Sequence, residues 1–349
     1  MVAAFDAIDS WFEPGFKVRK QKAAKVSSGR KSSASHSGGA RAGSVQSASA
    51  KAANIKSVIK KAPEVMVKIT GASDGTRSFK AHIDYISRNG KIELENETGD
   101  TLQGVETLRG LRDMHKHLNV PYEGKNNEFL HVMFSMPNGT PEKELRKAVA
   151  DFCKAEFSNR AYLMAFHSDT KSPHVHVCVG TRDLNAIDTP RLSPRKNDLQ
   201  RWRQSFAENL RSQGVDAAAS GRAVRGNFRK GEHAAVNQQR RDTPPRVPKV
   251  YEGMAKDAQA AVAANKRPTN PAQSKIDATR AAVAAQWASV ADKLAAAGDR
   301  SLSAAARRMV DSVGEVRSSA LQDLYDAAKD AQREQQRGGA GGRDTDYSL

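Results

Sequence analysis

The sequence predicts an α+β fold, with a largely antiparallel sheet flanked by helices and a helical C-terminal region. Several short segments are apolar or alternate between apolar and polar residues, which is typical of strands. Other segments carry apolar residues at helical spacing, and one pair of strands has the pattern of a hairpin. Because strands and helices mix without a strict strand–helix–strand alternation, an antiparallel sheet is favoured over a parallel one.

The individual elements follow from these patterns and from the turn residues that separate them. Strands are expected at 64–70, 91–96, 129–136, 160–167 and 174–179. Helices are expected at 76–88, 101–118, 141–157 and 196–213. The first of these helices places Phe79, Ile83 and Ile86 on one side, and Asn89-Gly90 ends it.

Composition divides the 349 residues into five parts, enough for one or two domains with their own cores. The expected parts are a basic arm without fixed structure at 1–62, a folded domain at 63–241, a linker at 242–274, a helical region at 275–337 and a loose Gly-rich tail at 338–349. In the helical region, apolar residues recur at 4-3 spacing, which predicts a helical hairpin or a coiled-coil segment.

The net charge of +17 indicates a polyanionic partner, nucleic acid first and an acidic membrane surface second. Residues 14–63 contain no Asp or Glu, so the arm is interpreted either as a phosphate-binding segment or as a solvated tail. Cys153 and Cys178 are too few for a disulfide framework, which predicts a reducing cytosol. No apolar run is long enough for stable membrane insertion, and no glycine-rich motif indicates a nucleotide cofactor.

Three of the nine histidines lie within ten residues, at His167, His174 and His176. His174 and His176 alternate with valines, so they point to the same face of a strand, roughly 6.5–7 Å apart along it. If a hairpin turn precedes them, His167 lies opposite on the neighbouring strand and three imidazoles converge. Such a site suits a divalent metal and leaves positions open for a substrate. Asp169 is expected to accept a hydrogen bond from a ligand histidine.

The segment from Ala81 to Leu94, with His82 and Tyr85, resembles the nucleophile motif of plasmid relaxases, in particular the P-type mobilisation group and the T-DNA border endonuclease. The histidine segment resembles the metal motif of that family, with His167, Asp169, His174 and His176 at matching spacing. Phe129 to Thr140, including Ser135, resembles the motif between them. The three motifs occur in the family's order and cover roughly residues 64–235.

The resemblance implies a relaxase-type palm over 63–241, in which a sheet carries the metal, Mg²⁺ or Mn²⁺, and a helix carries the tyrosine. It also implies site- and strand-specific nicking of single-stranded or supercoiled DNA at an origin of transfer. The enzyme would remain on the 5′ phosphate as a phosphotyrosine intermediate and could rejoin the strand. The implied partners are relaxosome accessory proteins and a type IV coupling protein. The implied setting is the bacterial cytoplasm, with export to a recipient cell during conjugative mobilisation.

The chemistry of these residues agrees with that implication. Tyr85 offers an oxygen that can attack a phosphodiester and form a covalent intermediate. A phenol has an ordinary pKa of about 10 and is a weak nucleophile near neutral pH, so a metal that polarises the phosphate would lower the barrier. His82 lies three residues before Tyr85 and is its neighbour on a helix. It either takes the phenolic proton or only packs beside the tyrosine.

Basic side chains flank the three motifs and are candidates for binding the backbone of single-stranded DNA. They are Arg77, Lys80, Arg88, Lys91 and Arg182, each of which can also be interpreted as a solvated surface charge. Ser135 either touches DNA or ends its strand.

Two alternatives remain beside the relaxase. A rolling-circle replication initiator or a transposase of related chemistry would place the histidine pair ahead of the tyrosine, whereas Tyr85 precedes His167 here. A non-catalytic DNA-binding accessory protein would need neither the tyrosine nor the histidines. The helical region is interpreted either as a segment read by secretion machinery or as a cover that the nuclease needs for folding.

Overall fold

The computed structural model describes residues 47–104, 122–169, 172–186, 189–228, 234–241, 246–314 and 318–340. The chain divides into two compact units. The first consists of Met1–Gly221 and Ala288–Arg307, and the second consists of Arg222–Trp287 and Arg308–Leu349.

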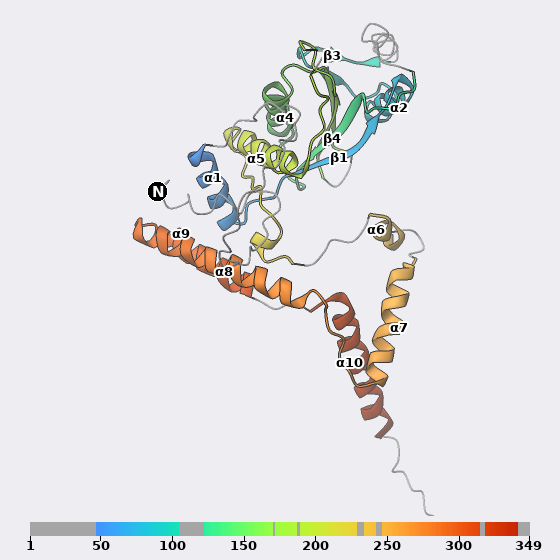
Figure 1. The fold of residues 1–349 in the computed structure, drawn as a ribbon, viewed down its shortest axis with the longest axis vertical. Coiled ribbons are helices and arrows are strands. Elements are labelled where there is room, and N and C mark those ends of the chain that lie inside the picture. Colours follow the sequence, from blue (N-terminus) through green and yellow to red (C-terminus); the bar gives the residue numbers. More distant parts are fainter. Residues whose placement is uncertain are drawn as a thin grey trace, which may run out of the picture. The chain divides into compact units, whose positions relative to one another are not determined.

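The first unit is built on a sheet. Its strands are β1 (Met66–Ser73), β2 (Leu94–Asn96), β3 (Thr101–Leu102), β4 (Phe129–Ser135), β5 (Tyr162–His167) and β6 (His174–Gly180). Within the described residues they form a six-stranded sheet in the order β1-β4-β6-β5-β2-β3, and all neighbouring strands are antiparallel. The α+β class and the antiparallel sheet expected from the sequence are confirmed (Figure 1).

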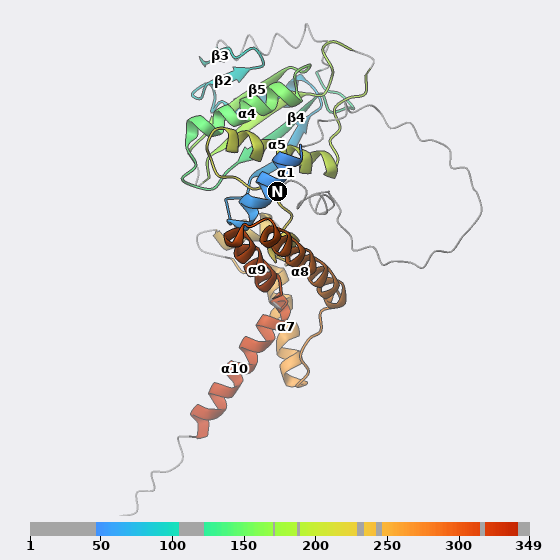
Figure 2. The same cartoon turned by 90° about the vertical axis from the view of Figure 1, so that its left-hand side faces the viewer.

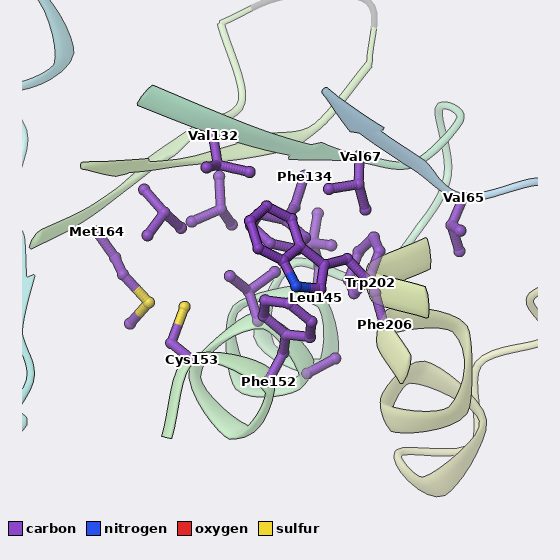
Figure 3. Close-up of a cluster of buried hydrophobic side chains, with 14 of the residues drawn as sticks. Val65, Val67, Val132, Phe134, Leu145, Phe152, Cys153, Met164, Trp202 and Phe206 are labelled. Carbon is purple, nitrogen blue, oxygen red and sulfur yellow. The ribbon is translucent and has the colours of Figure 1, made fainter. Parts of the chain in front are cut away.

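Helices cover both faces of this sheet. They are α1 (Ala48–Ile59), α2 (Thr76–Ile86), α4 (Glu142–Glu156) and α5 (Lys196–Ser212). Helices α4 and α5 lie on one face and α2 lies on the other (Figure 1). The larger core lies under α4 and α5, where Phe134 of β4 packs against Phe152 of α4 with ring centroids 4.9 Å apart and the rings tilted by 57° (Figure 3). Trp202 of α5 completes this aromatic cluster, 6.1 Å from Phe152.

A smaller core holds α2 on the opposite face. Phe79, Ile83 and Ile86 face the sheet, as their helical spacing predicts, and they pack against residues of β5 and β6 that include Leu163 and Cys178. Period-2 alternation explains the division: in β6 the valines enter the larger core, while His174, His176 and Cys178 face α2. Helix α2 is thereby fixed over the face that carries the histidines.

Two segments differ from the expected elements. Residues 48–59, assigned by composition to an unstructured arm, form α1, in which Ile55, Val58 and Ile59 are buried. The Asn54 side chain exchanges two hydrogen bonds with the Ala219 backbone. The helix expected at 101–118 is wrong at its start, because Thr101–Leu102 pairs with β2 as strand β3. Its residues from 105 onward lie outside the described part of the chain.

Helices make up most of the remainder. Their bounds are η3 (Ala223–Arg225), α6 (Ala234–Arg241), α7 (Lys249–Ala263), α8 (Gln273–Ala296), α9 (Arg300–Gly314) and α10 (Ala320–Ala340). Helix α7 occupies part of the expected linker and packs against α10 in the second unit (Figure 2). In α8, the apolar repeat that predicted a helical hairpin supplies buried side chains at Val283, Trp287, Val290 and Leu294.

Polar contacts hold these helices in place. Ser303 of α9 donates to the Ala291 carbonyl of α8 over 2.7 Å. The Arg267 guanidinium binds the Asp326 carboxylate of α10 through two hydrogen bonds of 3.1 and 2.6 Å. Among the described residues, none of the helices has the length and apolar character that crossing a bilayer requires.

Candidate active site

Three histidines converge at the end of the β5–β6 hairpin where the connection between the two strands lies. His167 of β5 is the register partner of His174 on β6, and His176 lies two residues further along the same face. Their ring centroids are 4.7 to 5.2 Å apart, and one nitrogen from each ring lies within 4.8 Å of the others. The convergence inferred from strand alternation is therefore present in the fold.

The hydrogen bonds of these rings indicate which nitrogens would bind a metal. Nε2 of His167 donates to the Ile86 carbonyl over 2.7 Å, which leaves Nδ1 as the atom that could bind a metal. Nδ1 of His174 donates to the Ser172 carbonyl over 3.0 Å, so Nε2 takes that role. Neither ring nitrogen of the buried His176 has a hydrogen-bond partner among the described residues. An orphaned buried imidazole between two oriented ones fits a metal ion as the missing partner.

Burial favours the neutral form of two of these imidazoles, His167 and His176. Burial, together with repulsion from His167 and His174, lowers the pKa of His176 to about 3. Burial likewise lowers the pKa of His167 below its usual value. A neutral imidazole has a lone pair to offer, whereas an imidazolium has none. His167 and His176 can therefore offer lone pairs to a metal at neutral pH.

Helix α2 brings Tyr85 to this histidine cluster. The Tyr85 side chain is 55% exposed, and its ring centroid lies 5.9 Å from that of His176 in an edge-on arrangement. His82, one helical turn earlier, lies 6.4 Å from Tyr85. Because the opposite side of α2 is buried in the smaller core, the helix presents Tyr85 to solvent at the edge of the cluster. A nucleophile needs this combination of access and a nearby electrophilic centre.

His82 stacks on a fourth histidine of the sheet, His131 of β4. Their ring centroids are 3.4 Å apart and the rings are parallel to within 1°. Ser73 Oγ lies 2.8 Å from His131 Nε2 and fixes that ring. Burial first, and repulsion between neighbouring histidines second, lowers the pKa of His82 to about 3 and that of His131 to about 4.

His82, His131 and Cys178 also place one potential ligand atom each within 4.8 Å of the others. Parallel stacked imidazoles direct their lone pairs along parallel planes, so both rings cannot point at one ion. Burial raises the pKa of the Cys178 thiol, which disfavours the thiolate that metal binding requires. This second group is therefore a packing arrangement that holds His82.

Asp169 has a different partner from the one that spacing suggested. Its Oδ2 accepts a hydrogen bond from Arg88 over 2.7 Å. The same Arg88 nitrogen lies 3.4 Å from His167 Nδ1, and the guanidinium lies 5.2 Å from the centre of the Tyr85 ring. Asp169 therefore reaches the histidine cluster through Arg88.

The remaining candidate residues divide by location. Lys80 and Lys91 are exposed in and just after α2. Arg77 is exposed and bonded to Glu123 over 2.7 Å. Ser135 is buried, and its hydroxyl donates to the Pro173 carbonyl over 3.4 Å. Arg182 binds the buried Glu128 beyond the far end of β6, eight residues and roughly 26 Å of strand from His174.

His131 is the site residue that the sequence reading missed. It lies in the expected strand 129–136, but its importance depends on β4 lying beside β6, where His131 pairs with Cys178. No local pattern encodes that pairing. One feature of the sequence could have indicated it: His131 and Ser135 are four residues apart, so in a strand both side chains lie on the same face.

Residues 85–215 match a family model described as Relaxase: MobA/VirD2-like, nuclease domain. The chain is also similar to curated proteins named T-DNA border endonuclease VirD2. The one from Rhizobium rhizogenes is 27% identical over 191 residues, which cover 48% of this chain and 43% of that protein. The one from Agrobacterium fabrum is 26% identical over 187 residues, covering 47% and 41%. The chain spans less than half the length of these relatives.

Proposed function

We propose that this chain, whose residues 85–215 match a MobA/VirD2-like relaxase nuclease domain, is a relaxase that nicks one strand of plasmid or other mobile DNA at an origin of transfer. The observation that carries the proposal is an exposed tyrosine, Tyr85, 5.9 Å from the orphaned His176 of a three-histidine cluster. Neither the tyrosine nor the cluster alone would indicate this chemistry. The contact between Tyr85 of α2 and His176 of β6, which are far apart in sequence, indicates this chemistry.

The reaction is a transfer of a phosphoryl group from one oxygen to another. The Tyr85 oxygen forms a bond to phosphorus while the bond to the 3′ oxygen breaks. The phenolic proton leaves Tyr85, and the released 3′ oxygen gains one. The bond energy stays in the 5′-phosphotyrosine, so attack by a 3′ hydroxyl reverses the step and rejoins the strand.

His167, His174 and His176 would hold the divalent ion, Mg²⁺ or Mn²⁺, which would polarise the phosphate and offset its developing charge. Hard Mg²⁺ prefers oxygen ligands, so an all-imidazole set favours Mn²⁺ of the two. His82 is half-buried and neutral, and its buried Nε2 has no hydrogen-bond partner among the described residues. With a pKa of about 3 it is suited to relaying a proton and poorly suited to retaining one.

The DNA contacts are proposed from position. Lys80, Arg88 and Lys91 lie in α2 or shortly after it, close to Tyr85 in sequence, and we propose that they contact the phosphates on either side of the nick. Arg77 lies at the start of α2 and Arg182 lies beyond the far end of β6, so their contribution to binding is expected to be smaller. Relaxosome accessory proteins, a type IV coupling protein and export to a recipient cell complete the proposed setting.

Tyr85→Phe tests the proposal directly. The variant removes one oxygen atom from an exposed side chain, so we expect normal folding and DNA binding but no covalent adduct. The measurement is a nicking reaction on supercoiled DNA carrying the cognate origin, followed by a denaturing gel for protein–DNA bands. A band of wild-type intensity from the Phe variant would exclude Tyr85 as the nucleophile.

A further inference from the structure

The turn that follows α2 aims a charged side chain back at the active site. Arg88 and Asn89 both have left-handed backbone conformations, with φ of 52° and 57°. Non-glycine residues rarely adopt this conformation, and here hydrogen bonds hold it, from Asn89 N to Asp84 O and from Gly90 N to Ser87 Oγ. The chain turns out of the helix at Ser87, and Arg88 lies over Tyr85.

The Arg88 guanidinium joins the three parts of the site. It binds Asp169 over 2.7 Å and approaches His167 Nδ1 to 3.4 Å, and its carbon lies 5.2 Å from the Tyr85 ring centre. The side chain is 32% exposed, so it has solvent-facing room to move. The Asp169 side chain is 50% exposed, so Arg88 can change its position while it keeps this ion pair.

One of these contacts is incompatible with metal binding. Nε2 of His167 is committed to the Ile86 carbonyl, which makes Nδ1 the nitrogen that would face a metal. Arg88 directs an N–H at that same lone pair. One lone pair cannot accept a hydrogen bond and bind a cation together, and the two positive charges also repel each other.

We propose that Arg88 caps the metal-binding nitrogen of His167 in the metal-free protein and, once displaced from it, binds the phosphate that Tyr85 attacks. The second half rests on the proposed function, because it takes the ligand to be DNA. A planar guanidinium matches two phosphate oxygens, and its contacts to Asp169 and Tyr85 already place it beside the nucleophile. Arg88 is therefore a positioning residue for the metal and a binding residue for the phosphate.

The two roles are thermodynamically linked. A phosphate that draws Arg88 away from His167 uncovers Nδ1, so single-stranded DNA raises the affinity for metal. By reciprocity, metal raises the affinity for DNA by the same factor.

The experiment measures Mn²⁺ binding by calorimetry to the full chain in a Tyr85→Phe background, with and without a short oligo(dT). Arg88→Gln is expected to bind Mn²⁺ about fivefold or more tightly without DNA, the lower end of usual site-to-site coupling. In the protein that retains Arg88, oligo(dT) is expected to raise the Mn²⁺ affinity. In Arg88→Gln, oligo(dT) is expected to give no such increase. Arg77→Gln is the matched control: it removes an arginine that also binds a carboxylate but lies at the start of α2, and it should leave the Mn²⁺ affinity without DNA unchanged.

Equal or weaker Mn²⁺ binding by Arg88→Gln, or an equal gain from the Arg77 control, would overturn the inference. If Arg88→Gln melts early, Arg88→Lys repeats the test. A lysine keeps the positive charge but lacks the planar guanidinium, so the Mn²⁺ affinity of Arg88→Lys should fall between those of the Arg88→Gln variant and the protein with Arg88. A Mn²⁺ affinity of Arg88→Lys below that of the protein with Arg88 counts against the capping role. A shift in Mn²⁺ affinity without any nicking by the unmodified chain supports the role of Arg88 and counts against the nicking function. Nicking by the unmodified chain without a shift in Mn²⁺ affinity in Arg88→Gln supports the nicking function and counts against the role of Arg88.

Discussion

His176 is buried with both ring nitrogens unpaired among the described residues, and a buried polar group without a partner destabilises the fold. Its neighbours are oriented by backbone carbonyls so that their remaining nitrogens approach it. A structural role alone would leave this imidazole unexplained, because an apolar residue in the same place would be more stable. Metal binding would satisfy it.

Alanine at His167, His174 or His176 is expected to weaken Mn²⁺ binding about 10-fold or more, since each removes one ligand of three. Chelator should stop nicking by the unmodified chain, and Mn²⁺ or Mg²⁺ should restore it. The measurement combines calorimetry with the nicking assay. His82→Gln is the control: it should keep Mn²⁺ affinity and lower the nicking rate. Undiminished nicking in excess chelator would rule out a catalytic metal.

The stacked pair His82–His131 has a consequence for stability against pH. Their pKa values are lowered by burial to about 3 and about 4, whereas an unfolded histidine has a pKa near 6.5. Between about pH 6.5 and 4 the unfolded chain therefore binds protons that the folded chain does not. The contribution of these two histidines to the free energy of unfolding is therefore fully present above about pH 6.5 and is lost as the pH falls.

We expect His131→Phe to flatten this dependence by up to about 1.4 kcal/mol per pH unit, the value for one titrating group. Phenylalanine can keep the stack with His82 but cannot take up a proton. Its stability at neutral pH should drop, because Ser73 loses its partner. Urea unfolding across the window, with chelator present, measures both effects. Parallel curves for the two proteins would show that His131 titrates normally in the fold.

At the scale of elements, local patterns and non-local pairings contribute separately. The alternation around His174 predicted the β5–β6 hairpin, and helical spacing predicted the buried side of α2. Neither pattern reveals that β4 lies beside β6, which brings His131 to the site. Likewise, Arg182 is close to the histidines in sequence, but an intervening extended strand separates them. In α1, apolar Ile55, Val58 and Ile59 stand among so many Ser, Ala and Lys residues that composition obscured the helix.

The sheet depends on α4 for the packing that fixes β4 and β6. Phe152→Ala is expected to cost about 3–5 kcal/mol of unfolding free energy, because Phe152 is fully buried among Phe134, Phe157 and Trp202. Lys147→Ala, on the exposed side of the same helix, should change it by less than about 0.5 kcal/mol. Chemical unfolding of both variants tests this. Similar small losses would mean that the core closes around the missing ring.

At the scale of the whole chain, the sequence placed a boundary near 242, but the first compact unit also includes Ala288–Arg307. That segment carries the end of α8 and the start of α9, which are joined by the Ser303–Ala291 hydrogen bond. Helix α10 differs, because its packing partner is α7 in the second unit. Two truncations therefore have different consequences.

A fragment of residues 1–314 removes α10 and keeps every segment of the first unit, so we expect it to nick purified DNA like the full chain. A fragment of residues 1–250 also removes Ala288–Arg307 and should melt at a lower temperature. If secretion machinery reads the C-terminal helices, the longer fragment will nick yet lose transfer between cells, a separation that a purely structural role cannot produce. Melting, nicking and mating assays on both fragments decide the matter. Loss of nicking by residues 1–314 would contradict the export role and make α10 part of the folded nuclease.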